Sequence, residues 1–435
     1  MRRLLPLLIL VALLGACDSG DEDDPAARPA AAAPPPPAIT RAELGEHLAA
    51  LQRIADRNGG NRAAGTPGYD ASADYVAERL REAGWRVRRQ PVPFTHFRLR
   101  RALLAVGGRR LRRIRDFQVL SYSGSGSAVG TLAGAANGCD HGNFGALGGG
   151  EIPLVGRGEC LFREKARNAE LAGAPALVVV GEVQSRRGVP SGTLGVPGIR
   201  IPVVLVSFDA LGESGVGSTV RIGVDAVSRS SRTENVIAET PGGSGDRVVM
   251  AGGHLDSVAG GPGINDNGSG TATLIEAAEA IRADPPGARV RLAFWGAEEL
   301  GLLGSRHYVR SLAGDERRRI RAYLNLDMVG SPNPVPELYA DGNAELARVL
   351  RRAARPGGLG TVGAGRSSDH APFQEAGIPV SGLYTGGPEA GSGGRTRDPC
   401  YHLPCDTLRH VNRRVLLRMA RATAEALRVL STRHK

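Results

Sequence analysis

The sequence predicts an α/β fold, with a mainly parallel mixed sheet that is covered by helices on both faces. Strand-like runs alternate with helical patterns from residue 235 to the end of the chain, which is typical of βα units. The last helical pattern, residues 412–430, keeps its apolar side chains on one face. The strand patterns lie at 248–250, 290–295 and 323–326, and a further helical pattern lies at 271–281.

The first helices precede this region. Thr40 and Glu43 form a capping-box pattern ahead of leucines at helical spacing, so a helix is expected to begin there. Residues 69–83 show a second amphipathic pattern that stops at Gly84, and residues 85–92 can form a strand. We expect these elements to join the later sheet in one domain.

The middle of the chain has a different character. Residues 94–232 are rich in glycine and contain short apolar runs, such as 152–155, 176–180 and 203–206, with one helical pattern at 162–172. No residue in this segment has a catalytic pattern. The sequence therefore predicts a small β-rich domain inserted into the α/β domain.

Length and charge limit the functions that need to be considered. The chain has 435 residues, which is enough for two or three domains. Its net charge is +11. The arginines are scattered, without a basic block or interleaved aromatic residues, so the sequence does not indicate nucleic-acid binding. We expect a monomer.

The N-terminus has the pattern of an export signal. Two arginines are followed by the apolar run 4–14, which is too short to span a bilayer. The run ends in Leu-Gly-Ala-Cys17, which resembles a bacterial lipobox. We therefore expect a signal peptide at 1–16, a lipidated Cys17 and a disordered linker over 17–39. The protein would be exported and lipid-anchored to the bacterial cell envelope, on its periplasmic or extracellular face.

Export would allow disulfides among the other four cysteines. Four cysteines allow three connectivities. We favour the two local pairs, Cys139–Cys160 and Cys400–Cys405. The alternative for the second pair is a thiolate metal site, which the carboxylate-rich surroundings disfavour.

Candidate metal ligands gather at predicted strand ends. His254 and Asp256 follow the run 248–250, and Asp266 stands just before the helical pattern 271–281. Ligands in open α/β sheets bind at the carboxyl ends of strands. Imidazole and carboxylate ligands together suit zinc or a similar divalent ion, and Asp256 could hold the far ring nitrogen of His254.

Further candidates follow the later strands. Glu298 and Glu299 come after 290–295, Asp327 comes after 323–326, and His402 lies in a late loop. We therefore expect one metal-binding edge of the sheet.

Two resemblances now become specific. Residues 40–93 and 233–435 resemble the double-zinc aminopeptidases, which implies the zinc-exopeptidase fold, and residues 94–232 resemble the protease-associated domain. The first resemblance rests on HLDSV (254–258), GINDNGSG (263–270), WGAEELG (295–301), NLDMVGSPNP (325–334), RSSDHAPF (366–373) and CYH (400–402). The second rests on IPLVGRGECLF (152–162), KARNA (165–169) and AGA (172–174). The stretch 386–397 is shorter than the family pattern, which puts contacts at the cleft rim in doubt.

The family pattern implies a role for each matching residue. It gives two zinc ions per chain, one held by His254 and Asp327, the other by Glu299 and His402, with Asp266 bridging. It also gives a bridging water whose proton Glu298 accepts as general base. Tyr401 would steady the oxyanion and Arg366 would contact the substrate. Asp256 and Asp369 would support the ligands.

The sequence thus favours a zinc aminopeptidase that acts on peptides with a free N-terminus and prefers Leu-like first residues. Three alternatives stay open: a glutaminyl cyclase, a carboxypeptidase on the same fold, and a non-catalytic receptor-like peptide-binding protein. The intact Asp266, Glu298 and Glu299 speak against the cyclase, and the complete ligand set speaks against the receptor.

Overall fold

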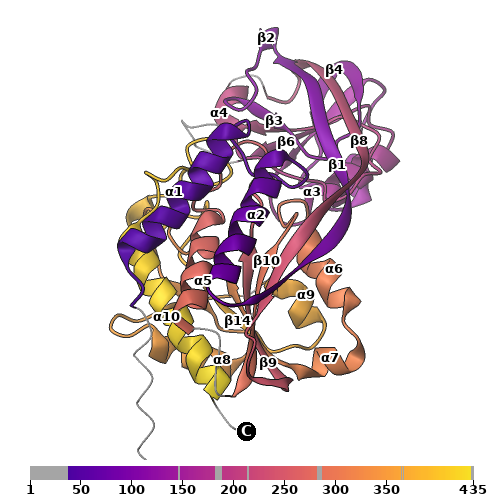
Figure 1. The fold of residues 1–435 in the computed structure, drawn as a ribbon. Helices are drawn as coiled ribbons and strands as arrows, with labels where there is room; N and C mark the ends of the chain where they lie inside the picture. Colours follow the sequence, from indigo (N-terminus) through magenta and orange to yellow (C-terminus); the bar gives the residue numbers. More distant parts are fainter. Residues whose placement is uncertain are drawn as a thin grey trace, which may run out of the picture. The chain divides into compact units, whose positions relative to one another are not determined.

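The computed structural model describes residues 38–145, 147–181, 189–212, 215–281, 287–363, 365 and 367–432 (Figure 1). The expected signal peptide, Cys17 and most of the expected linker lie outside the described residues, as does Arg366. In the part of the chain that is described, no helix combines the length and apolar character needed to cross a membrane.

One sheet runs through the whole described chain, in the order β13-β12-β14-β11-β9-β10-β8-β4-β5-β6-β7-β3. Its C-terminal half is the mainly parallel mixed sheet expected from the sequence: β9, β10, β11 and β14 are parallel neighbours, whereas β12 and β8 join antiparallel. The strands of this half are β9 (Ser244–His254), β10 (Ala288–Trp295), β11 (Ile320–Leu326), β12 (Glu337–Tyr339), β13 (Gly360–Val362) and β14 (Val380–Tyr384).

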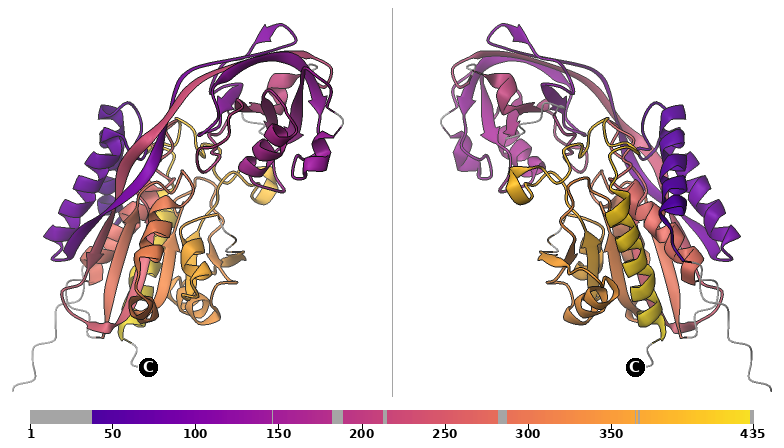
Figure 2. Two further views of the ribbon diagram at one scale, coloured as in Figure 1. Left: turned by 90° about the vertical axis from the view of Figure 1, so that its right-hand side faces the viewer. Right: turned by 90° about the vertical axis from the view of Figure 1, so that its left-hand side faces the viewer.

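Helices cover both faces of this half-sheet, as Figure 2 shows. On one face, a large apolar core joins helices to the sheet, and its helices are α1 (Arg41–Arg57), α2 (Pro67–Glu82), α5 (Gly268–Ile281), α8 (Ala344–Ala353) and α10 (Arg413–Thr432). The opposite face has a smaller aromatic core around Trp295, with α6 (Leu303–Ser311), α7 (Gly314–Arg319) and α9 (His370–Glu375) on that side.

The first helix begins where the capping pattern places it. The Thr40 hydroxyl accepts a hydrogen bond from the Glu43 N–H at 3.2 Å, and the Glu43 carboxylate accepts one from the Thr40 N–H at 3.0 Å. This reciprocal pair satisfies two N–H groups that have no partner within the helix. The leucines of α1 then face α5 in the large core.

Two long strands connect the halves of the sheet. β1 (Arg86–Val106) and β8 (Thr219–Glu239) pair antiparallel along almost their whole length, as the ribbon in Figure 2 shows. The expected short strand at 85–92 is therefore only the beginning of β1. The predicted domain limits fall inside this pair, with Pro93 directly opposite Arg232. A local pattern could not reveal this, because the polar residues of an exposed two-stranded ribbon mimic a loop.

The inserted half contains the short strands that the sequence indicates. They are β2 (Arg109–Arg110), β3 (Phe117–Val119), β4 (Gly126–Gly134), β5 (Glu151–Gly156), β6 (Leu177–Gly181) and β7 (Val203–Ser207), with α3 (Phe162–Leu171), α4 (Phe208–Leu211) and the 3-10 turn η1 (His141–Phe144). Two apolar cores lie on either side of these strands. The second 3-10 turn, η2 (Ser392–Gly394), belongs to the C-terminal half.

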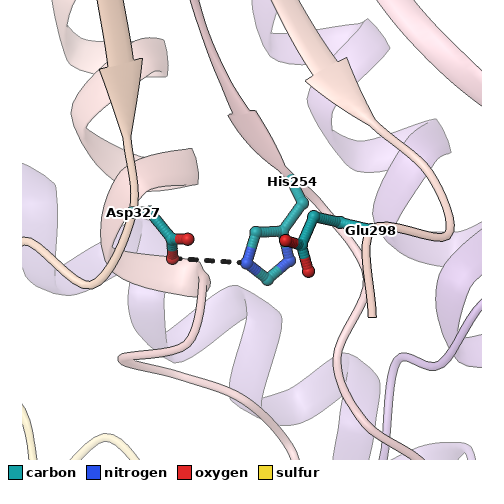
Figure 3. A group of neighbouring side chains, drawn as sticks. All are labelled: His254, Glu298 and Asp327. Atoms are coloured by element: carbon teal, nitrogen blue, oxygen red, sulfur yellow. Dashed lines mark hydrogen bonds and ion pairs between the residues drawn. The ribbon is translucent and has the colours of Figure 1, made fainter. Parts of the chain in front are cut away.

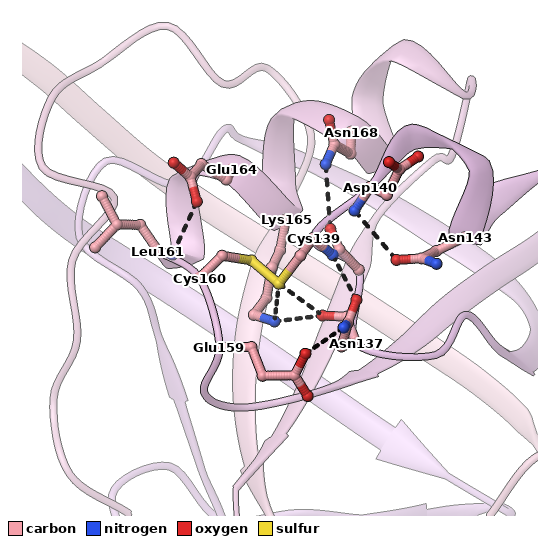
Figure 4. Close-up of a disulfide and its surroundings, with 11 residues drawn as sticks. Asn137, Cys139, Asp140, Asn143, Glu159, Cys160, Leu161, Glu164, Lys165 and Asn168 are labelled. Atoms are coloured by element: carbon pink, nitrogen blue, oxygen red, sulfur yellow. Dashed lines mark hydrogen bonds between the residues drawn. A yellow bond between two sulfur atoms is a disulfide. The ribbon is translucent and has the colours of Figure 1, made fainter.

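Both expected disulfides are present, Cys139–Cys160 and Cys400–Cys405. Figure 4 shows the first one beside Lys165, whose ammonium group donates to the carbonyl of Asn137 and lies 3.4 Å from the sulfur of Cys139. The pair Cys139–Cys160 ties the segment before η1 to the start of α3.

Candidate active site

The predicted ligands meet at the carboxyl edge of the parallel strands. β9 ends in His254, β10 ends three residues before Glu298, and β11 ends immediately before Asp327. Register places Trp295 of β10 beside His254, so the three segments leave the sheet at one level. These strands are buried on both faces near their ends, and their parallel register fixes which residues emerge there.

The carboxylate of Asp266 joins two histidines. One of its oxygens lies 3.2 Å from Nε2 of His254, and the other lies 3.2 Å from Nε2 of His402. These histidines are 148 residues apart in the sequence, because one ends a strand and the other lies in a late loop. Asp266 is buried just before α5, so a single carboxylate faces both imidazoles.

Each histidine has a second carboxylate of its own. Asp327 lies 3.3 Å from Nε2 of His254, and Glu299 lies 3.0 Å from Nε2 of His402. The site thus consists of two groups, each with one imidazole and one carboxylate, that share Asp266.

Glu298 stands beside the first group. Figure 3 shows its carboxylate next to the His254 ring, with Asp327 on the other side of the same imidazole. One potential ligand atom from each of these three residues lies within 4.8 Å of the others. By this distance, Glu298 and Asp327 are both within reach of one cation held at His254.

The hydrogen bonds of the imidazoles indicate that positive charge is needed between these groups. Nδ1 of His254 lies 3.0 Å from the carbonyl oxygen of Asp256, and Nδ1 of His402 lies 3.2 Å from the carbonyl oxygen of Ser191. A carbonyl only accepts, so each Nδ1 carries the hydrogen, and in a neutral ring the Nε2 lone pair then faces carboxylate oxygens. That arrangement is repulsive unless a proton or a metal ion lies between them.

The carboxylates show the same need for positive charge. Among the described residues, Oε1 of Glu299 is buried and has no hydrogen-bond partner. Burial raises the pKa of Glu298 well above its ordinary range, and the negative charges of Asp369 and Glu299 add to the increase. Burial also raises the pKa of Asp266, but hydrogen bonds from the two histidines outweigh this effect and hold that pKa low. The donor set of imidazoles and carboxylates suits zinc.

Asp256 supports the site differently from the expectation. Its carboxylate lies 3.8 Å from Nδ1 of His254, whereas its main-chain carbonyl takes the hydrogen bond. The carboxylate accepts instead from the N–H groups of Glu298 and Glu299, at 3.1 and 3.3 Å. In the irregular main chain that follows β9, the carbonyl of Asp256 lies closer to the His254 ring than its carboxylate does, and no spacing rule reveals this.

Tyr401 and Asp369 also lie at the site. The Tyr401 ring stacks on His402, with ring centroids 3.7 Å apart, and burial together with nearby Asp266 raises its pKa. Asp369 is fully buried just before α9. Burial raises the pKa of Asp369 to about 7. The nearby His370 packs its ring against Tyr339 at 4.6 Å. The position of Arg366 lies outside the described residues.

Sequence reasoning missed a residue that holds Asp266 in place. Asp406 is buried, and its carboxylate accepts from the N–H groups of Asn265 and Asp266, at 2.7 and 2.9 Å. It directly follows Cys405 in the loop that carries His402. The signal was present, because Asp406 stands beside the CYH motif, but its partners lie 140 residues earlier.

Arg62 is a second residue that the sequence did not single out. It is fully buried and donates to the carbonyls of Leu255, Pro262 and Gly263. A fully buried guanidinium needs several partners, and here they are the backbone of the loop between the first ligand and Asp266. The sequence showed only a Gly- and Asn-rich loop around residue 62.

A third missed residue is Ser368. Its hydroxyl donates to Asp327 at 2.7 Å and accepts from the Asn325 amide at 2.9 Å. These bonds fix the carboxylate of Asp327 toward His254.

Known protein families match both halves of the chain. The model of peptidase family M28 matches residues 235–427, and the model of the PA domain matches residues 125–213. The first range contains all of the ligand candidates, and the second lies between β1 and β8.

Relatives match over most of the length. An aminopeptidase of Pseudomonas aeruginosa is 37% identical over 85% of this chain and 77% of its own length. The probable lipoprotein aminopeptidase LpqL of Mycobacterium tuberculosis is 38% identical over 85% of this chain and 81% of its own. The solved structure of a zinc aminopeptidase from Bacillus subtilis, at 30% identity, superimposes with a TM-score of 0.72, covering 90% of this chain and 96% of that one. The chain therefore belongs to peptidase family M28 and is a zinc-dependent hydrolase that also carries a PA domain.

Proposed function

We propose that this metal-dependent aminopeptidase binds two zinc ions and removes Leu-like residues from the N-terminus of peptides with a free α-amine. The observation that carries the proposal is the Asp266 carboxylate, which presents one oxygen to each of two imidazoles at 3.2 Å. A bridging carboxylate between two equivalent imidazole–carboxylate groups is suited to a pair of cations.

In this proposal His254 and Asp327 hold one zinc ion, Glu299 and His402 hold the other, and Asp266 bridges them. The bound ions would polarise the scissile carbonyl and lower the pKa of the attacking water. Hydrogen bonds from Ser368 to Asp327 and from the backbone to Asp406 support the ligand positions.

Glu298 is the proposed general base. Its backbone N–H is fixed by Asp256, and its carboxylate faces the His254 group. A buried carboxylate with a raised pKa is suited to accept a proton and then return it. Glu298 would take the proton of the attacking water and deliver it to the leaving amine.

Tyr401 is the proposed donor to the oxyanion that forms as water adds to the carbonyl. Its ring is held by stacking on His402 and its hydroxyl keeps its proton because burial raises its pKa. Arg366 and Asp369 keep the roles that the family pattern gives them, at the substrate end and behind the ligands.

The charges of the site favour an amino terminus over a carboxylate. A substrate α-ammonium would be attracted by Glu298 and Asp327, whereas a carboxylate there would be repelled. The apolar sequence of β14 suggests a wall for a pocket that takes the first side chain, but Val380 and Leu383 pack into the two cores instead.

A panel of amino-acid nitroanilides and their N-acetylated counterparts tests this proposal. Leucyl and methionyl compounds should be cleaved, acetylation should stop cleavage, and glutamyl or aspartyl compounds should react at least ~10-fold more slowly, because burying an unpaired charge is costly. Equal turnover of the acetylated compounds, or shortening of unblocked peptides from the carboxyl end, would overturn it.

We also propose that the protein is anchored to the cell envelope by lipid on Cys17. The lipobox-like pattern supports this, and one relative is named a probable lipoprotein. Cys17→Ser should move the protein from the membrane fraction to the soluble fraction. Recovery of the wild-type protein without lipid would contradict the anchor.

The domain limits remain part of the proposal: a catalytic domain at 40–93 and 233–435, and an inserted domain at 94–232. The direct pairing of Pro93 with Arg232 supports a limit at one level of the β1–β8 ribbon. Limited proteolysis that releases fragments ending elsewhere would argue against these limits.

A further inference from the structure

The two candidate histidine ligands take their orientation from different parts of the chain. Nδ1 of His254 donates to the carbonyl of Asp256, two residues away. Nδ1 of His402 donates to the carbonyl of Ser191, 211 residues away in the inserted half. This hydrogen bond directs Nε2 of His402 toward Asp266 and Glu299.

The segment that carries Ser191 is fixed within the inserted half. The Gly192 carbonyl accepts from the Ser121 N–H at 2.9 Å, and the Leu194 N–H donates to the Ser121 carbonyl at 2.9 Å. The Leu194 side chain is buried in one of the two inserted cores. A methyl group on Gly192 would come within 2.8 Å of the Leu120 side chain and 3.1 Å of the Phe162 ring, so the main chain packs closely against both.

A second contact joins the inserted half to the segment of Glu299, which is the proposed partner of His402 at the same zinc ion. Leu300, which follows Glu299, packs against the inserted core that contains Leu194. The backbone at Gly301 also lies close to Gly195. Both proposed ligands of one zinc ion, Glu299 and His402, are therefore tied to the inserted half, whereas His254 is held by the catalytic sheet.

We propose that the inserted domain is a positioning element of one metal group, acting through the Ser191 carbonyl on His402. Partners of the second ring nitrogen of a histidine ligand set its orientation and basicity, and losing one typically lowers metal affinity by ~10–100-fold. The inference rests on the proposed role of His402 as a ligand. It gives the inserted domain a direct effect on zinc retention, separate from access to the cleft.

The test compares two leucines of the same inserted core in the full-length, zinc-loaded protein. Leu194→Ala should loosen the segment that carries Ser191, whereas Leu177→Ala removes a leucine from β6 and is the matched control. Both are almost completely buried, so both should lower the melting temperature. Competition with a coloured chelator should show about 10-fold weaker binding of one zinc ion in Leu194→Ala and no change in Leu177→Ala.

A milder variant and a spectroscopic measurement keep the test valid if Leu194→Ala misfolds. Thr193→Val removes the hydroxyl that accepts from the Gly195 N–H at 2.9 Å and should weaken the same zinc ion to a smaller degree. In 15N-histidine-labelled protein, the Nδ1 proton of His402 should exchange faster with water in both segment variants than in Leu177→Ala. Its signal is identified by its loss in His402→Gln.

The outcomes separate the two proposals. Equal zinc affinity in Leu194→Ala and Leu177→Ala, with unchanged Nδ1 exchange, would overturn the positioning role. Full retention of both zinc ions by His402→Gln would instead overturn the ligand assignment on which it rests.

Discussion

The His254 side and the His402 side of the active site are built in contrasting ways. His254 ends a buried parallel strand, and pairing within the sheet fixes its position beside the neighbouring strand. Its ring is oriented by the carbonyl of Asp256, two residues away. His402 lies in a loop outside the helices and strands, closed by the Cys400–Cys405 disulfide, and its ring is oriented from the inserted half. The shared carboxylate of Asp266 connects these two sides.

This difference shows that a symmetrical set of proposed ligands need not have symmetrical support. The first group depends on the core of the sheet, so its metal ion should be the harder one to remove. The second group depends on a loop, a disulfide and a distant segment, so it should be lost under milder conditions. Metal removal, substitutions and disulfide loss can each test this contrast.

Metal removal should have the largest effect, because both groups depend on cations. A strong chelator should abolish cleavage of a leucyl substrate, and added zinc should restore it. Elemental analysis of the active protein should give about two zinc ions per chain if Asp266 bridges a pair. During a gradual chelator titration, the ion held at His402 should leave first. Full activity of a fully metal-depleted preparation would contradict the mechanism.

Substitution of the two adjacent glutamates should separate catalysis from metal binding. Glu298→Gln should keep both metal ions and lower kcat by ~10²–10⁴-fold, because the general base is lost. Glu299→Gln should lose the metal ion on the His402 side. Metal content and kcat are measured on the same preparations. Equal metal loss in both variants would show that the assigned division between Glu298 and Glu299 is wrong.

Loss of the Cys400–Cys405 disulfide should mainly affect activity, whereas loss of the Cys139–Cys160 disulfide should mainly affect stability. Replacing Cys400 and Cys405 by serine should lower activity about tenfold, because that disulfide closes the loop that carries Tyr401 and His402. The stability cost should be the smaller of the two, about 2 kcal/mol, since a five-residue separation closes only a short loop. Replacing Cys139 and Cys160, which are 21 residues apart, should cost about 3 kcal/mol of stability and leave kcat nearly unchanged. The reverse pattern would contradict the proposed role of the loop.

The smallest effect is expected at a residue that supports neither side of the site. Thr40→Ala removes the hydroxyl that caps α1 and should lower the free energy of unfolding by about 1 kcal/mol. Denaturant unfolding measures this change, and kcat and zinc content should stay at the wild-type values. A loss of zinc in this variant would mean that the stability of α1 is coupled to the ligand positions.

Some features of this protein were determined by the sequence alone. The alternation of strands and helices predicted the mixed sheet, because periodicity depends only on neighbouring residues. The order of the ligand motifs predicted one metal-binding edge, and the structure brings His254, Asp266, Glu299, Asp327 and His402 together there. The capping of α1 and the two local disulfide pairs were also predictable, because they involve residues that are close in the sequence.

Other features were decided only by the tertiary structure. The continuity of the sheet through β8, the hydrogen bonds of Asp406 to the backbone of Asp266, and the contact of Ser191 with His402 all join distant segments. The course of the main chain after β9 also decides that His254 is held by the carbonyl of Asp256 and not by its carboxylate. Such contacts depend on how elements pack and on backbone groups that every residue carries, so no pattern of side chains along the chain specifies them.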